Sequence, residues 1–281
     1  MKIAKKLQDL APYDPTTQEF EVVLDANESF LQPEGALRDA IDAGILVALN
    51  TGRDLSESRL VLDRVPEIPY LLGCTGAYLM DLRTDERLIS HPVPIALARQ
   101  AYEILARYDT LVSLYMDDVV YNQAAKMAEF TRFYPPELVS VFSSHHGVPD
   151  LGALLDARTQ DIDKYYVVFV DPDEQKQAFA EMAELPLFVT RAAMLDMEVM
   201  AQGANKGAIL LDLASRLGLR PDEIAAIGDS ENDLPMLQAA GLGIAMGNAK
   251  PHIQAAADVV APTNEQDGLA WAVDQILKGA L

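Results

Sequence analysis

The chain has 281 residues, half of them hydrophobic and 23% charged, a composition typical of a globular protein with one large or two modest domains. Its 43 acidic residues outnumber its 22 basic ones, which gives a formal net charge of −21. Because nucleic acids and anionic lipid surfaces are bound mainly through basic patches, this charge excludes both as expected partners.

The composition also bears on location. No apolar run reaches the length of a membrane span, and residues 1–8 lack the apolar core of a signal peptide. The single cysteine, Cys74, excludes an internal disulfide framework and fits a reducing compartment. We therefore expect a cytoplasmic protein that binds no membrane. The sequence does not indicate an oligomeric state.

The first third of the chain predicts alternating helices and strands. Apolar residues recur at helical spacing from residue 33, and Gly44 stands where this helix should end. An apolar strand over residues 45–49 follows, and another over residues 69–72 leads into Gly73. Alternation of this kind favours a parallel sheet covered by helices.

The middle third predicts mixed α and β structure. Residues 115–121 indicate two short strands around the turn Asp117-Asp118. We expect further strands over residues 164–171, 187–190 and 194–200, with a helix over residues 174–183. This content is typical of a second domain inserted into the first. We place the inserted α/β cap domain at residues 84–200 and the core domain at residues 1–83 and 201–281.

The last third returns to the helix–strand alternation of the first. A helix beginning at Lys206 should end at Gly218, and an apolar strand should lead into Asp229. A helix over residues 234–240, strands over residues 243–246 and 257–261, and a helix from about Asp267 complete the pattern. The expected fold class is α/β, a Rossmann-like core whose parallel sheet is assembled from both ends of the chain.

The run Gly228-Asp229-Ser230-Glu231-Asn232-Asp233 groups three carboxylates and an amide directly after a predicted buried strand. Ligands of open α/β sheets bind beyond the carboxyl ends of the strands, so Asp229 and Asp233 should face a crevice. Grouped carboxylates repel one another unless a cation compensates them, and such oxygen ligands suit Mg²⁺. The alternative for a lone Gly-Asp, an ordinary turn, explains the whole run less well.

Several ordered motifs resemble those of Cof-type phosphatases, members of the haloacid dehalogenase superfamily with a large α/β cap (class IIB). The resemblance covers about residues 33–281. It rests on Thr51-Gly52-Arg53, Lys206-Gly207, the acidic run at 228–233, Ala245-Met246-Gly247-Asn248-Ala249 and residues 255–260. Thr75-Gly76-Ala77 is similar to the family's Asn-Gly-Ala, with Thr in place of Asn.

The resemblance implies a Mg²⁺-dependent phosphoric monoester hydrolase that acts on small phosphorylated metabolites through an aspartyl-phosphate. It implies catalytic roles for Asp25 as the nucleophile and Lys206 as the neutralising cation. It implies phosphate binding by Thr51, Gly52, Lys206, Asn232 and Asn248, and metal binding by Asp25, Asn27, Asp229 and Asp233. The Asn27 contribution would come from its backbone carbonyl.

The first motif departs from the family pattern Asp-x-Asp-Gly-Thr. The apolar run at residues 20–24 is followed by Asp25-Ala26-Asn27-Glu28-Ser29, so an amide stands where the family has its general acid. An amide cannot donate a proton in that role, and the 26 positions from Asp25 to Thr51 are fewer than the family usually has. We expect an impaired phosphatase. The alternative is a non-catalytic relative that binds metal and phosphate.

A second resemblance covers only about the first thirty residues. Leu10-Ala11-Pro12-Tyr13-Asp14-Pro15 and residues 24–30 resemble the N-terminal arm of histidinol-phosphate aminotransferases. Nothing downstream resembles the rest of that enzyme, so we expect no aminotransferase activity. The chain is interpreted as a phosphatase whose first strand was replaced by a foreign segment, through a natural fusion or a gene-model artefact.

The cap should select the substrate, because caps of this kind present side chains to the leaving group. The polar or aromatic candidates are Tyr121, His145, His146 and Glu198. The simpler alternatives are that the two histidines lie in a solvated loop and that Glu198 pairs within its own sheet.

Overall fold

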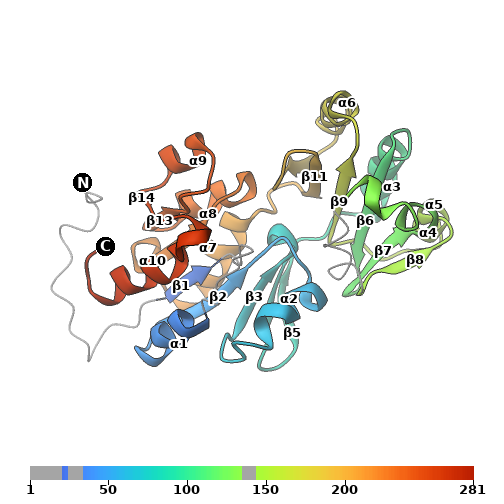
Figure 1. Cartoon of the computed structure of the whole chain (residues 1–281). Helices are drawn as coiled ribbons and strands as arrows, with labels where there is room; N and C mark the ends of the chain where they lie inside the picture. The colour runs from blue at the N-terminus through green and yellow to red at the C-terminus, as the bar shows by residue number, and fades with distance from the viewer. Residues whose placement is uncertain (1–20, 25–33, 135–143) are drawn as a thin grey trace.

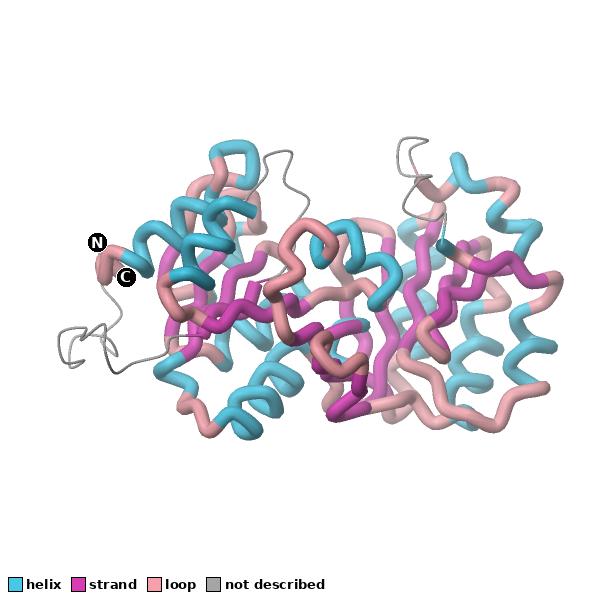
Figure 2. Tube along the Cα trace, turned by 90° about the horizontal axis from the view of Figure 1, so that it is seen from below, coloured by secondary structure: helices cyan, strands magenta, loops and turns pink. Residues whose placement is uncertain are grey.

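The computed structural model describes residues 21–24, 34–134 and 144–281, and of residues 21–24 it describes the backbone. The described residues form two β-sheets that lie toward opposite ends of an elongated molecule (Figures 1 and 2). We call the eight-stranded sheet the core sheet and the six-stranded sheet the cap sheet. Within the described ranges, no helix is both long enough and apolar enough to cross a membrane.

The core sheet has the strand order β14-β13-β12-β1-β2-β3-β4-β5. Neighbouring strands run parallel from β14 to β3, and β4 and β5 add an antiparallel hairpin at one edge. The sheet therefore uses strands from both ends of the chain, as predicted. Its strands are β1 (Glu21–Leu24), β2 (Leu46–Asn50), β3 (Tyr70–Gly73), β4 (Tyr78–Asp81), β5 (Glu86–Ser90), β12 (Ile224–Gly228), β13 (Leu242–Ala245) and β14 (Val259–Val260).

The strand β1 lies in the middle of the core sheet, between β12 and β2. Leu24, its last residue, is in register with Ile227 on one side and with Leu49 on the other. The apolar run before Asp25 thus occupies the central position that the sequence assigns to the first strand.

Helices cover both faces of the core sheet. Along β2, Val47 and Leu49 pack with one set of helices and Ala48 with the other, as the two-residue repeat of a strand requires. One face carries α1 (Glu34–Asp42), α2 (Leu55–Leu62) and α10 (Gly268–Leu277). The other carries α7 (Lys206–Leu217), α8 (Leu234–Ala239) and α9 (Pro251–Ala256).

The cap sheet has the order β10-β11-β9-β6-β7-β8. Its strands are β6 (Thr110–Met116), β7 (Val119–Gln123), β8 (His146–Val148), β9 (Lys164–Phe169), β10 (Leu187–Thr190) and β11 (Asp196–Ala201). The helices α3 (Ile95–Leu105), α5 (Leu151–Asp156) and α6 (Pro172–Met182) pack on one face, and α4 (Ala124–Met127) follows β7. The turn between β6 and β7 uses Asp117 and Asp118, both at positive φ, where the sequence predicts it.

The other face of the cap sheet is turned toward the core sheet and carries polar and aromatic side chains. Tyr115, Lys164, Tyr166 and Glu198 stand at alternating positions of β6, β9 and β11, opposite in phase to the apolar residues under the helices. This face therefore brings charge to the space between the two sheets.

The hairpin β4–β5 differs from the sequence prediction. Its turn contains no glycine or proline and is closed by Asp85 at positive φ, so the usual turn residues are missing. Because β5 belongs to the core sheet, that sheet extends to Ser90, beyond the expected boundary at residue 83. The division into a core domain and an inserted domain remains our interpretation.

The Lys-Gly pair at the start of α7 yields a stability prediction. A Cβ on Gly207 would lie 2.4 Å from the backbone oxygen of Pro235, so Gly207→Ala should force α7 away from α8. We expect a loss of about 1–3 kcal/mol in the free energy of unfolding, the usual cost of overpacking, measurable by chemical denaturation. The matched control is Gly35→Ala in α1, where a Cβ meets nothing within 4 Å. Equal stability of the two variants would contradict the close approach of α7 to α8.

Candidate active site

Four loops meet at the carboxyl ends of the parallel strands of the core sheet. Thr51 follows β2, Thr75 follows β3, Asp229 follows β12, and Asn248 lies in the loop after β13. The amide of Thr75 donates to the carbonyl of Thr51 (2.9 Å), and Asn248 Nδ2 donates to Asp229 Oδ2 (2.9 Å). The structure thus brings together residues that the sequence places far apart.

Two of the predicted site residues, Asp25 and Asn27, lie outside the described residues. Asp25 is joined by one peptide bond to Leu24, the end of β1. On either side of β1, the strands β12 and β2 lead into Asp229 and Thr51 in the same direction.

A buried ion pair joins the start of α7 to the acidic run. Lys206 Nζ lies 2.6 Å from Asp233 Oδ1, and the two side chains are 1% and 0% exposed. Asp233 Oδ2 accepts hydrogen bonds from the backbone amides of Asp229 (2.9 Å) and Ser230 (2.8 Å). The Asp233 carboxylate is therefore compensated by a cation and by two amides, which a buried charge requires. Through these bonds it fixes the backbone that carries Asp229.

The Asp229 carboxylate is partly exposed at the same edge. Its Oδ1 accepts from the hydroxyl of Ser230 (3.0 Å), and its Oδ2 accepts from Asn248. Across the described parts of the chain, no three His, Cys, Asp or Glu side chains form a group that could hold a metal ion. The oxygen chemistry of Asp229 fits Mg²⁺, whereas both oxygens of Asp233 are engaged by Lys206 and backbone amides.

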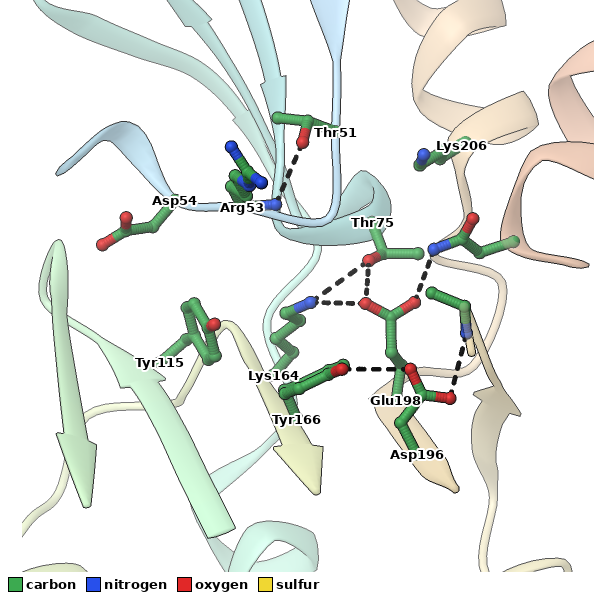
Figure 3. A network of polar contacts seen from close by, with 12 residues as sticks. Thr51, Arg53, Asp54, Thr75, Tyr115, Lys164, Tyr166, Asp196, Glu198 and Lys206 are labelled. Atoms are coloured by element: carbon green, nitrogen blue, oxygen red, sulfur yellow. Dashed lines mark hydrogen bonds and ion pairs between the residues drawn. The ribbon is translucent and has the colours of Figure 1, made fainter. Parts of the chain in front are cut away.

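In the loop Thr51-Gly52-Arg53, Thr51 is buried and Gly52 lies close to the cap sheet. Thr51 is 4% exposed, and its Oγ1 accepts from the amide of Arg53 (3.2 Å) (Figure 3). A Cβ on Gly52 would lie 3.0 Å from Glu198 Oε1 and 3.4 Å from Thr75 Oγ1. The glycine therefore allows the cap carboxylate to approach the backbone of this loop closely.

Glu198 on β11 is the centre of a network between the two sheets (Figure 3). Its Oε1 accepts from Lys164 Nζ (2.6 Å) and from Thr75 Oγ1 (2.9 Å), and its Oε2 accepts from Asn232 Nδ2 (2.9 Å). Lys164 also donates to Thr75 Oγ1 (3.3 Å). Lys164 and Glu198 are 1% and 2% exposed. Burial raises the pKa of Glu198, but Lys164 and Asn232 outweigh it and leave the pKa below its ordinary value.

Thr75 has a backbone conformation that is unusual for a β-branched residue. It lies within the short 3₁₀ helix Cys74–Gly76 at φ 58°, in the left-handed region. Asn, which stands first in the resembled Asn-Gly-Ala motif, tolerates such a φ better than Thr does. The hydroxyl of Thr75 donates to Glu198, so Thr75 makes a polar contact with the cap sheet.

A second network joins Glu57 of α2 to the cap sheet. Glu57 Oε1 lies 3.0 Å from His145 Nε2, and Tyr115 donates its hydroxyl to Glu57 (3.2 Å). His145 Nδ1 lies 2.8 Å from Asn122 Oδ1, and Asn122 Nδ2 is used as a donor to Val112 and Ser113. The two imidazole nitrogens therefore lie against oxygens of Glu57 and Asn122, which fixes the orientation of the ring. Burial raises the pKa of Glu57, but His145 and Lys164 together lower it below the ordinary value of 4.5.

The four cap candidates from the sequence have different locations. Glu198 and His145 face the core sheet, where Glu198 bonds to core loops rather than within its own sheet alone. His146 is exposed on β8. Tyr121 packs with the residues under the cap helices, on the face of the cap sheet turned away from the core sheet.

Sequence reasoning missed Lys164 and Glu57. Lys164 carried a usable signal, since a charged residue begins an otherwise apolar strand and shares its face with Tyr166. Glu57 carried none, because its partners Tyr115 and His145 come from segments far away in the chain.

Comparison with known proteins is consistent with this geometry. The profile of the haloacid dehalogenase-like hydrolases matches residues 26–273. A 5-amino-6-(5-phospho-D-ribitylamino)uracil phosphatase, YcsE of Bacillus subtilis, is 27% identical over 85% of this chain and 84% of its own. The pyridoxal phosphate phosphatase YbhA of Escherichia coli is also 27% identical, over 89% and 95% of the two chains. A haloacid dehalogenase-like hydrolase from B. subtilis shares the fold with a TM-score of 0.79 at 21% identity, covering 91% of this chain and 99% of its own.

The Glu57 network yields a pH prediction. A carboxylate whose pKa is lowered by folding stabilises the protein above its ordinary pKa, and this contribution is lost as the pH falls through the lowered value. Glu57→Gln should therefore cost about 1.5–3 kcal/mol at neutral pH, the range for hydrogen bonds to charged groups. The difference from the wild type should shrink as the pH falls below 4.5.

Urea denaturation over a pH series measures this difference. The control is Glu86→Gln, an exposed residue of β5. A Glu57→Gln deficit that stays constant down to acidic pH would show that the carboxylate is not ionised in the folded protein.

Proposed function

Since the chain belongs to the haloacid dehalogenase-like hydrolases and is a phosphatase of the Cof type, we propose that it hydrolyses small phosphate monoesters through an aspartyl-phosphate on Asp25, with Mg²⁺ as cofactor. The observation that carries this proposal is the meeting of Thr51, Lys206 and Asp229 around the carboxyl end of β1. Asp25 follows that strand directly in the sequence.

Phosphate binding is assigned to Thr51, Gly52, Lys206, Asn232 and Asn248. In a chain with net charge −21, an anionic substrate needs a local cation, and Lys206 is held at the site by its buried pair with Asp233. Phosphoryl transfer depends on positioning and charge stabilisation more than on covalent help from the protein. The hydroxyl and amide groups at this edge supply that positioning.

Metal binding is assigned to Asp25, the backbone carbonyl of Asn27, and Asp229. A bound Mg²⁺ would neutralise developing charge on the transferred phosphoryl group. The bonds of Asp233 to Lys206 and to the amides of Asp229 and Ser230 favour an orienting role for this residue. Asp233, one of the four predicted metal residues, thus orients the metal site by holding the backbone amide of Asp229.

In the proposed reaction, a carboxylate oxygen of Asp25 attacks phosphorus while the bond from phosphorus to the leaving oxygen breaks. Water then attacks the acyl phosphate, which releases inorganic phosphate and restores the carboxylate. In this proposal Lys206, held by Asp233, supplies positive charge to the transferred phosphoryl group. The relatives named for pyridoxal phosphate and for a phosphoribitylamino-uracil support a small phosphorylated metabolite as the substrate.

The amide of Asn27 favours slow turnover of substrates whose leaving alkoxide needs a proton. It stands where the family has its general acid, and an amide cannot protonate a leaving alkoxide. The competing proposal is a relative that binds metal and phosphate without turnover, and the same residue favours it. Hydrolysis of a generic aryl phosphate with and without Mg²⁺ separates the two, because only the phosphatase releases phosphate.

The metal assignment is tested by Asp229→Ala. Removing this carboxylate should abolish the rise in melting temperature that Mg²⁺ causes in the wild type, because a ligand stabilises the state that binds it. The control is Asp39→Ala, an exposed residue of α1 that should keep the full Mg²⁺ response. A full response in Asp229→Ala would place the metal elsewhere.

The general-acid position is tested by Asn27→Asp. A positioned general acid contributes about 10²–10⁴-fold, and an alkyl phosphate needs this proton more than an aryl phosphate does. Asn27→Asp should therefore raise the rate most for alkyl phosphates and least for aryl phosphates, measured as released phosphate. Unchanged rates for both substrates would mean that residue 27 does not reach the leaving oxygen.

A further inference from the structure

We propose that Glu198 of the cap sheet is a positioning residue for phosphate, because it orients the amide of Asn232 in the core. The proposal rests on the proposed function, since it takes Asn232 as a phosphate-binding group. It assigns Glu198 to the phosphate rather than to the leaving group.

The amide nitrogen of Asn232 faces Glu198. Asn232 is 4% exposed, and its Nδ2 donates to Glu198 Oε2 (2.9 Å). An ionised carboxylate only accepts hydrogen bonds, so the nitrogen of the amide must face Glu198. The second hydrogen of this nitrogen stays available for another acceptor, such as a phosphate oxygen. Asn232 Oδ1 finds no hydrogen-bond partner among the described residues, so no bond on that side opposes this orientation.

The carboxylate of Glu198 is paired with the ammonium group of Lys164. Lys164 Nζ lies 2.6 Å from Glu198 Oε1, and both side chains are almost fully buried. Removing one partner of such a pair leaves an uncompensated buried charge, whereas the intact pair keeps the carboxylate ionised. Lys164 therefore acts on Asn232 indirectly, through the state of Glu198.

The carboxylate of Glu198 lies close to several core loops. Glu198 also accepts from Thr75 Oγ1 (2.9 Å), and its Oε1 would lie 3.0 Å from a Cβ on Gly52. It thus touches the loops after β2, β3 and β12 together. A shift of β11 would remove the acceptor of Asn232, so the placement of the cap sheet and the phosphate affinity are coupled.

The test compares Glu198→Gln with the double variant Lys164→Met/Glu198→Gln. Glutamine keeps the shape of the side chain, but one of its two terminal atoms is an NH₂ group that only donates. It therefore cannot accept hydrogen bonds at both ends from Lys164, Thr75 and Asn232, as the carboxylate does. The double variant leaves no uncompensated buried charge and so guards against simple unfolding. The control is Glu103→Gln, an exposed residue of α3.

The readouts are the dissociation constant of inorganic phosphate by calorimetry with Mg²⁺, the Mg²⁺-induced thermal shift, and turnover of an aryl and an alkyl phosphate. We expect phosphate binding to weaken about 10- to 100-fold in both variants, the effect of losing one hydrogen bond to a charged group. The Mg²⁺ shift should persist, and KM should rise by the same factor for both substrates, because phosphate is the part they share.

Phosphate affinity equal to that of the wild type in both variants would overturn the positioning role. A loss that differs between the aryl and the alkyl substrate would overturn it too, since Glu198 would then contact the leaving group. If the wild-type protein itself binds no phosphate and releases none from either substrate, the proposed function fails and the positioning role fails with it.

Discussion

The buried ion pair between Lys206 and Asp233 is the interaction on which the candidate site depends. Lys206 begins α7, whose first turn is capped by Asn205 and approaches the backbone of Pro235 closely at Gly207. Asp233 then binds the amides of Asp229 and Ser230, which fixes the loop beyond β12. One ion pair thus couples helix packing to the position of the carboxylate assigned to the metal.

The cap sheet adds a second constraint through two buried carboxylates. Glu198 reaches down from the cap sheet to Thr75 and Asn232, and Glu57 reaches up from α2 to Tyr115 and His145. Each carboxylate lies against a nitrogen of the cap, Lys164 Nζ beside Glu198 and His145 Nε2 beside Glu57. The two sheets therefore meet through buried polar groups, since Glu198 and Lys164 of the cap sheet contact core loops and Glu57 of α2 contacts the cap.

Much of the fold and part of the candidate site could be predicted from the sequence. Apolar runs and their spacing identified the strands that end at Thr51 and Asp229, and the parallel order brings those ends together. The hairpin β4–β5 escaped prediction because its turn at Asp85 lacks glycine and proline. The partners of Glu57 and Glu198 escaped as well, because they depend on how two sheets face each other, which no local pattern encodes. Asp25 and Asn27, outside the described residues, remain predictions from the resemblance alone.

The most direct measurement is chemical trapping of the phosphorylated intermediate. The protein is mixed with Mg²⁺ and an aryl phosphate, quenched, and reduced with borohydride, which converts an aspartyl-phosphate into homoserine. Peptide mass spectrometry should then find homoserine at position 25, dependent on substrate and Mg²⁺, and absent from Asp229 and Asp233. Turnover without modification of Asp25, or modification of another aspartate, would contradict the proposed reaction.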